Sequence, residues 1–192
     1  MITIKIVIGS TRPGRFGPKP AAWLMELARD VPNVTFELVD LADANLPLLD
    51  EPVPPSISAE YANEHTKAWA AQMVAADGFV FVVPEYNHSY AAATKNAFDY
   101  LYKEWVDKPI AFLSYGAGAG GTRAIEHLRT VVSNLKMFGI SEHVIIPNYW
   151  EKLDEQGNFK PSEGQTKTAK EMLQQIAFWS EQFQVARAKK QG

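Results

Sequence analysis

Short apolar runs alternate along the chain with longer segments in which apolar residues recur at helical spacing. The short runs have the length and composition of buried strands, and the longer segments carry the i, i+3, i+4, i+7 stripe of amphipathic helices. The third run, residues 79–83, is apolar at every position, which indicates a central strand that is covered on both faces. Strands are predicted at residues 2–8, 34–39, 79–83, 110–113 and 144–146.

Each predicted strand is followed, directly or after a loop, by a segment of helical period. This alternation predicts a doubly wound parallel sheet with right-handed crossovers and helices on both faces, folded as a single domain over residues 1–192. A segment with four prolines, residues 45–58, is predicted as a loop held against the surface. The stripes of the five predicted helices are Leu24, Leu27, Ala28 and Val31; Ala62, Trp69 and Met73; Phe98, Leu101, Tyr102 and Trp105; Ile125, Leu128, Val132 and Leu135; and Met172, Ile176, Trp179 and Phe183.

Composition narrows the class of protein. The 192 residues are 46% hydrophobic and 21% charged with a formal net charge of −3, which is typical of a globular chain rather than of a disordered or membrane-spanning one. Lysine and arginine are scattered, so neither a nucleic-acid surface nor an anionic-membrane surface is expected. The apolar stretch that begins the sequence is too short for a signal peptide, and we expect a cytoplasmic protein.

Thiol and metal chemistry are not expected. The chain has no cysteine, which excludes disulfides, cysteine–zinc sites and thiol nucleophiles. Its four histidines contain no close ligand pair such as H-E-x-x-H, so no metal site is predicted.

The loop after the first strand is predicted over residues 9–20, and its residues 9–17 have the composition of a phosphate site. Ligands of open α/β sheets bind beyond the carboxyl ends of the strands, near the point where strand order reverses. Here Ser10 and Thr11 offer hydroxyls, Arg12 and Arg15 offer guanidinium groups, and a helix follows whose N-terminus attracts anions. The alternative is an ordinary polar turn with solvated arginines. The G-K-[ST] ending of a P-loop is missing.

The loop after the third strand, residues 84–90, combines two tyrosines with an asparagine and a glutamate. Such a set offers stacking faces beside donors and acceptors, as a planar heterocycle with imide-like edges requires. Ser89 or Asn87 is also suited to cap the next helix, and capping is compatible with ligand contact. Glu85 is a candidate catalytic acid, although a structural carboxylate is the favoured interpretation.

The loop after the fourth strand, residues 114–121, is rich in glycine. Gly116, Gly118 and Gly121 match G-x-G-x-x-G, but the run follows the fourth strand and no acidic residue follows the next strand to hold a ribose. A dinucleotide fold is therefore not inferred. The small residues either let backbone approach a flat ring edge or let a helix pack closely on a strand, and both interpretations stay open.

Together these loops resemble the NADPH-dependent FMN reductase family of flavodoxin-like proteins, which includes azo-, chromate- and quinone-reducing members. Residues 84–90 and 95–99 are similar to the family's P-E-Y-N-x-S motif and the K-N-A-x-D helix that follows it, and residues 114–124 are similar to its third signature. The likeness covers residues 3–135. It implies a five-stranded sheet of order 2-1-3-4-5, FMN as cofactor, NADPH or NADH as co-substrate, and a homodimer or tetramer.

The resemblance also implies a set of cofactor-binding residues and no catalytic side chain, because the flavin carries the hydride chemistry. The first loop would hold the flavin phosphate, the second would pass along the isoalloxazine ring, and the third would close the other side. In that order, the expected residues are Ser10, Arg12 and Arg15 with Phe16 and Gly17; Pro84, Glu85, Tyr86 and Asn87; and Ser114, Tyr115 and Gly116. Lys95 and Asp99 also match family positions but are interpreted as an exposed i, i+4 ion pair.

Two positions depart from the family pattern. Ala91 stands where a proline is frequent, which changes only how the next helix starts. The first loop has Phe16-Gly17-Pro18 where the family has a serine or threonine, so one expected phosphate hydroxyl is missing. Arg15 and backbone amides would then have to compensate.

The predicted function is transfer of hydride from NADPH through bound FMN to a small acceptor by a ping-pong reaction. Quinones, azo compounds, free flavin and metal oxyanions all fit a shallow pocket that stacks on rings. The main alternative is a flavodoxin-type electron carrier or a flavin-binding redox sensor without turnover. Two arginines in the phosphate loop and a net charge of only −3 argue against the carrier. A receiver domain is a weaker alternative, because Gly9-Ser10 and Pro84 stand where it needs an acidic cluster and a phosphorylatable aspartate.

Overall fold

The computed structural model describes residues 1–191. Five strands and seven helical segments follow one another along the chain. The strands are β1 (Ile2–Ile8), β2 (Val34–Asp40), β3 (Gly78–Pro84), β4 (Pro109–Tyr115) and β5 (Phe138–Ile146). The helices are α1 (Pro18–Ala28), α2 (Leu41–Ala44), α3 (Glu64–Val74), α4 (Ala92–Asp99), α5 (Thr122–Asn134), the 3₁₀ helix η1 (Tyr149–Lys152) and α6 (Glu163–Gln191).

The strands form one parallel sheet in the order β2-β1-β3-β4-β5, as predicted. The strand order reverses between the neighbouring strands β1 and β3: the chain passes from β1 to β2 on one side of this pair and from β3 to β4 on the other. All positions of β3 and β4 are buried, as expected for central strands that are covered on both faces.

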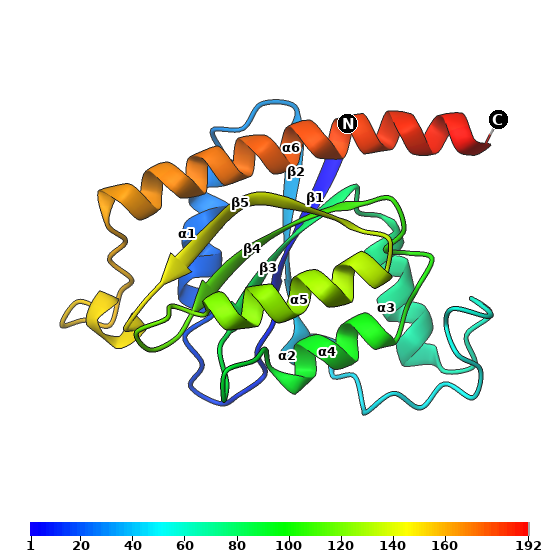
Figure 1. Ribbon diagram of the computed structural model, residues 1–192, viewed down its shortest axis with the longest axis horizontal. Helices are drawn as coiled ribbons and strands as arrows, with labels where there is room; N and C mark the ends of the chain where they lie inside the picture. Colours follow the sequence, from blue (N-terminus) through cyan, green and yellow to red (C-terminus); the bar gives the residue numbers. More distant parts are fainter. Residues whose placement is uncertain (192) are drawn as a thin grey trace.

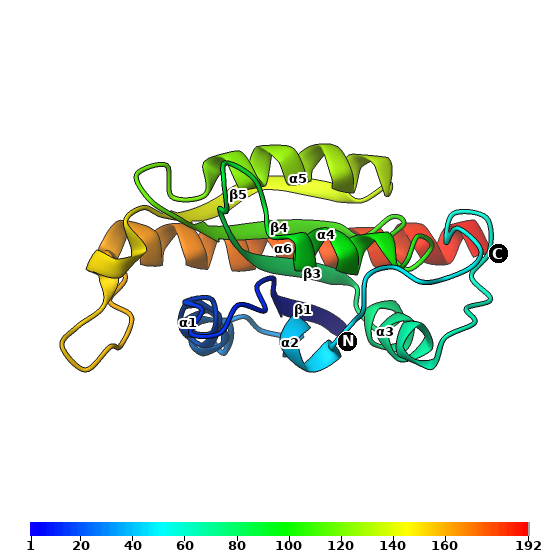
Figure 2. The same ribbon diagram turned by 90° about the horizontal axis from the view of Figure 1, so that it is seen from below.

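Helices cover both faces of the sheet: in Figure 1 α6 lies above the strands and α4 and α5 lie below them, and Figure 2 looks at the strands from below. On one face α1 and α6 pack against alternate side chains of the central strands, such as Val80 and Val82. On the other face α3, α4 and α5 pack against the intervening side chains, such as Phe79 and Phe81. Successive side chains of each strand point to opposite faces of the sheet, so alternate residues contribute to two separate hydrophobic cores. Among the described residues no helix is both long and apolar enough to cross a membrane.

The helix start after the first loop comes earlier than the sequence suggested. The interpretation of residues 9–20 as loop included Pro18 and Pro20, but both lie in the first turn of α1. Proline is tolerated there because the N–H groups of the first turn have no partner inside the helix. The last strand is also longer than predicted and begins at Phe138.

The predicted helix through Leu101, Tyr102 and Trp105 is wrong. α4 ends at Asp99, and the chain continues in successive turns up to β4. Trp105 is fully buried because these turns insert its ring beside Phe79, and its indole nitrogen donates to the carbonyl of Phe98 at 3.2 Å. The turns after α4 bury apolar side chains, and the spacing of these side chains in the sequence resembled that of a helix.

The proline-rich segment is held against α4, as predicted. The amide of Asn96 donates to the Pro47 carbonyl at 2.6 Å and its oxygen accepts from Leu49 N–H at 3.0 Å. The Tyr100 hydroxyl donates to Asp50 at 3.0 Å, and burial together with that carboxylate raises the pKa of Tyr100 to about 12. Figure 1 shows the segment running below α4 to α3.

We expect Phe81→Ala to lower the free energy of unfolding by about 3–5 kcal/mol, because it opens a cavity in the core between β3 and α4. Phe81 is fully buried and stacks on Phe98 with ring centroids 4.6 Å apart. Val74→Ala is the control, since Val74 is 60% exposed at the end of α3 and should cost less than about 0.5 kcal/mol. Urea unfolding measures both; equal effects would contradict the assignment of this core.

Candidate cofactor-binding site

The loops after β1, β3 and β4 leave the sheet at one edge, where the carboxyl ends of the parallel strands meet (Figure 1). They are also in direct contact. The hydroxyls of Ser10 and Tyr86 are 2.8 Å apart, and Glu85 N–H donates to the Tyr115 carbonyl at 2.9 Å. The fold therefore brings together residues of all three loops that the sequence singled out.

The first loop is anchored tightly where it leaves β1. Gly9 N–H donates to the Val82 carbonyl at 2.8 Å, and the Gly9 carbonyl accepts from the Thr94 hydroxyl at 2.6 Å. A Cβ at position 9 would lie 2.7 Å from that hydroxyl, so only glycine fits. Ser10 follows directly and is fully buried. The hydrogen bonds of Gly9 to β3 and α4 therefore hold the buried Ser10 in place.

The two arginines of the first loop differ in their surroundings. Arg12 is exposed, and the neighbouring Tyr86 phenol raises the pKa of its guanidinium, which stays charged. Arg15 forms an ion pair with Asp40, the N-cap residue of α2, and both side chains are largely buried. Arg12 thus forms no ion pair within residues 1–191 and lies beside the Tyr86 phenol, while Arg15 ties the loop to the end of β2.

The second loop is a tight turn. Tyr86 and Ser89 exchange backbone hydrogen bonds of 2.8 and 3.0 Å, and Asn87 and His88 between them have left-handed φ values of 49° and 66°. Asparagine tolerates this conformation better than most residues. Asn87 consequently lies at the exposed tip of the turn, and Tyr86 at its base is turned toward Ser10.

Glu85 is a structural clamp between the second loop and α5. Its carboxylate accepts from the guanidinium of Arg123 at 2.6 Å and from the backbone N–H of Arg123 at 3.2 Å. The side chain is only 8% exposed. Because both oxygens are engaged, the geometry agrees with the structural interpretation of Glu85. Lys95 and Asp99 form the expected i, i+4 ion pair at 2.6 Å, with both side chains partly exposed.

The third loop is a compact turn in which glycines serve different purposes. The Ser114 hydroxyl is buried and donates to the Gly120 carbonyl at 2.9 Å. Gly121 has a φ of 92°, and a Cβ there would lie 2.5 Å from the Cβ of Ser114. Gly118 has open space around it. Close packing therefore explains Gly121, whereas Gly118 is free of packing constraints.

An aromatic cluster that the sequence reasoning missed lies beside the first loop. Phe16 contacts Tyr115 and Tyr149, with ring centroids 5.1 and 4.9 Å apart. Tyr149 belongs to η1, directly after β5, and was not considered because η1 carries no recognisable periodicity. Phe16 is 3% exposed. Its ring is therefore a packing element that holds the loop against β4.

Two polar atoms near the first loop are buried without a hydrogen-bond partner in the described part of the chain: the Tyr115 hydroxyl and the Arg15 Nε. Buried donors are nearly always paired in folded proteins, so such atoms call for a partner. Together with Ser10 and Arg12, they form a set of donors and positive charge beside the start of α1. This set fits the phosphate of FMN.

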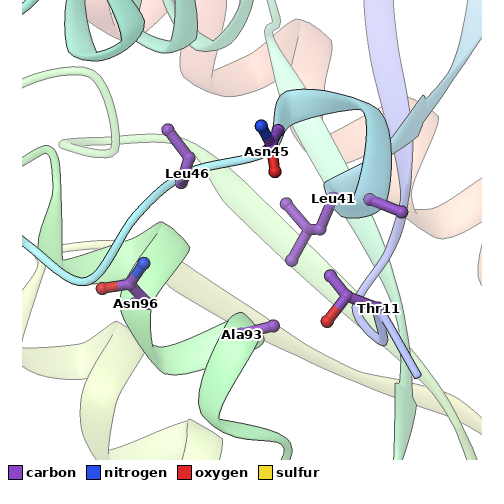
Figure 3. A pocket seen from close by; sticks show the side chains of 7 residues that line it. Thr11, Leu41, Asn45, Leu46, Ala93 and Asn96 are labelled. Atoms are coloured by element: carbon purple, nitrogen blue, oxygen red, sulfur yellow. The ribbon is translucent and has the colours of Figure 1, made fainter.

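A separate pocket of about 270 Å³ lies on the other side of the first loop, between that loop, α2 and α4. In Figure 3 Thr11, Leu41 and Ala93 point toward it from these three elements. Asn96 also lines it, but its amide is engaged by the proline-rich segment. None of the twelve residues expected to bind the cofactor lines this pocket.

Comparison with known proteins points to one family. The family model for NADPH-dependent FMN reductase matches residues 2–151. An NAD(P)H-dependent FMN reductase of Schizosaccharomyces pombe is 44% identical over 135 residues, which cover 70% of this chain and 67% of that protein. A 2-hydroxy-1,4-benzoquinone reductase of Burkholderia sp is 30% identical over 185 residues, 93% of this chain and 96% of that protein.

The fold has solved counterparts. The flavoenzyme NAD(P)H:(acceptor) oxidoreductase FerB from Paracoccus denitrificans superposes with a TM-score of 0.73 over 95% of this chain and 99% of that chain, at 23% identity. An oxidoreductase from Corynebacterium diphtheriae superposes with a TM-score of 0.71 at 14% identity, over 95% and 98% of the two chains. Identities this low support the shared architecture alone.

We expect Gly121→Ala to lower the free energy of unfolding by about 2–4 kcal/mol, because alanine meets both an unfavourable φ and the side chain of Ser114. Gly118→Ala is the matched control in the same loop and should be close to neutral. Thermal and urea unfolding of the two variants measure the difference. A Gly121→Ala variant as stable as Gly118→Ala would show that the turn is not closed as described.

Proposed function

The chain belongs to the NADPH-dependent FMN reductase family, and on that premise we propose that it passes hydride from NADPH through FMN to a quinone-type acceptor in a ping-pong reaction. It is an oxidoreductase that uses FMN and NAD(P)H. When bound, FMN accepts hydride from the nicotinamide and passes reducing equivalents to the acceptor. The protein supplies binding, orientation and electrostatics.

The observation that carries this proposal is the convergence of the three loops around unpaired donors. Ser10 and Tyr86 meet at 2.8 Å, Arg12 remains exposed, and the Tyr115 hydroxyl is buried without a partner in the described residues. We propose that Ser10, Arg12 and Arg15, with Phe16 and Gly17, form the phosphate end of the site. In this proposal the nucleotide's flat ring lies along the backbone of Pro84, Glu85, Tyr86 and Asn87, with Ser114, Tyr115 and Gly116 on its other side.

In the proposed site the protein positions the ring mainly through backbone. The side chains of Glu85 and Ser114 are engaged by Arg123 and Gly120, and Glu85 N–H donates to the Tyr115 carbonyl. In this proposal the Glu85 carbonyl is therefore the backbone group that faces the ring. Gly118 leaves open space beside this edge. A shallow site of this kind favours flat acceptors over bulky ones, and the name of the Burkholderia relative supports quinones among them.

We also propose that the protein acts as a homodimer or tetramer. Apolar side chains are exposed on the proline-rich segment, Leu48 at 81% and Ile57 at 76%. Exposed apolar side chains on one segment favour contact between subunits, because the contact removes them from water.

The purified protein should show the visible spectrum of an oxidised flavin, and addition of NADPH without oxygen should bleach it. Bleaching is expected because a bound nicotinamide delivers hydride directly to the cofactor. The spectrum is recorded before and after addition, with NADH in parallel to compare the two co-substrates. Bound flavin that does not bleach would contradict the reductase and favour a carrier or sensor.

A charge-reversal pair tests where the cofactor binds. Arg12→Glu should lower flavin content about tenfold or more, since it places a carboxylate beside the proposed phosphate. Arg29→Glu makes the same change of net charge at the other end of α1 and should retain flavin. Equal flavin content in the two variants would mean that the first loop does not hold the phosphate.

Steady-state kinetics should give parallel double-reciprocal lines when NADPH is varied at several concentrations of a benzoquinone. Parallel lines are expected because the oxidised nicotinamide leaves before the acceptor takes the same place. Intersecting lines would require both substrates to be bound together, and would contradict the ping-pong order while leaving the cofactor assignment untouched.

A further inference from the structure

The Tyr115 phenol is buried beside the start of α1 without a partner for its hydroxyl in the described residues. Tyr115 is the last residue of β4 and is 3% exposed. A Cβ built on Gly17, the N-cap residue of α1, would lie 3.1 Å from the Tyr115 oxygen. The hydroxyl therefore stands at the N-terminus of α1, in space that a side chain at position 17 would otherwise use.

The surroundings of the Tyr115 hydroxyl leave it as a hydrogen-bond donor without an acceptor in the described part of the chain. Burial raises the pKa of Tyr115 above its usual value, so the phenol keeps its proton at neutral pH. The neighbouring Ser10 hydroxyl and Gly17 backbone N–H act in the opposite direction on this pKa. Among residues 1–191 no partner lies within hydrogen-bond geometry of the buried phenol O–H, which is unfavourable unless an acceptor binds there.

The N-terminus of α1 is short of the donors that usually hold an anion. A helix start binds phosphate through the free N–H groups of its first turn. Here Pro18 and Pro20 have no N–H, and Lys19 N–H donates to the Phe16 carbonyl at 3.0 Å. Between Arg12 and α1 the loop also carries no hydroxyl side chain. A phosphate at this position needs a donor from another element.

We propose that Tyr115 supplies this donor: its hydroxyl binds the phosphate of FMN at the start of α1 and makes the site select FMN over riboflavin. This assigns the hydroxyl of Tyr115 to the phosphate end of the site, while the backbone of Tyr115 keeps its proposed place beside the ring. The inference rests on the proposed function, in which the first loop holds the phosphate. Tyr115 ends a buried strand, and Phe16 packs against its ring, so its hydroxyl is held in position before the ligand binds. A hydroxyl on a loop side chain would not be held in this way.

Flavin-free protein is titrated with FMN and with riboflavin, following the quenching of flavin fluorescence. Tyr115→Phe should weaken FMN binding by about tenfold to a hundredfold, as expected for loss of a hydrogen bond to a charged group. Riboflavin binding should stay unchanged, because riboflavin has no phosphate. The melting temperature of the flavin-free variant should rise or stay equal, because an unpaired buried hydroxyl is removed. A hydroxyl with a merely structural role would lower it.

A second pair of variants tests whether a hydroxyl at position 17, at the start of α1, can replace the hydroxyl lost from Tyr115. In the Tyr115→Phe background, Gly17→Ser should restore part of the preference for FMN, and Gly17→Ala, which adds the same Cβ without a hydroxyl, should not. Gly17 has φ −46° and ψ −38°, which either residue adopts. Loss of the phenol oxygen removes the nearest contact of a Cβ at position 17, and the Ile8 methyl at 3.2 Å must shift slightly in both variants alike.

The outcomes separate the two proposals. Wild-type protein that binds FMN no more tightly than riboflavin would refute the phosphate site itself, and with it the proposed function. If the wild type prefers FMN but Tyr115→Phe keeps that preference, the phosphate site stands and the role of Tyr115 is refuted. Equal weakening of FMN and riboflavin, or equal rescue by alanine and serine at position 17, would also overturn that role.

Discussion

Burial of β3 and β4 on both faces is the constraint on which the rest of the structure depends. A strand covered on both sides must satisfy its backbone groups within the sheet. Here all five strands run in one direction, so the connections cross over as helices that cover both faces, and the carboxyl ends of the strands share one edge. Polar residues that follow three strands far apart in the chain meet there without any further requirement.

The polar groups at this edge fall into two kinds. Some are paired within the protein and hold the loops in place, as Glu85 does with Arg123 and Ser114 with Gly120. Others, such as the Tyr115 hydroxyl and the Arg15 Nε, are buried without a partner in the described chain. Rigid clamps next to unpaired donors are typical of a preorganised binding site, because the cost of desolvation is met before the ligand arrives.

The sequence predicted the order of elements because strand and helix periodicities differ so clearly, and all five strands appear where apolar runs stood. Its failures lie where periodicity carries no information. The spacing of Leu101, Tyr102 and Trp105 resembled a helix, although a turn that buries one indole produces the same spacing. Short helical segments such as α2 and η1 have too few residues to show a period, and Tyr149 was missed for that reason.

By itself the sequence determined the parallel sheet, the three loops at its edge and the residue types available there, since these follow from local patterns. Only the tertiary structure decided which groups meet. Alternation along β4 places Ser114 and Tyr115 on opposite faces, but which helix covers each face is set by packing over the whole sheet. Whether an arginine pairs with Asp40 or stays exposed depends on contacts between segments distant in the chain, which no local pattern encodes.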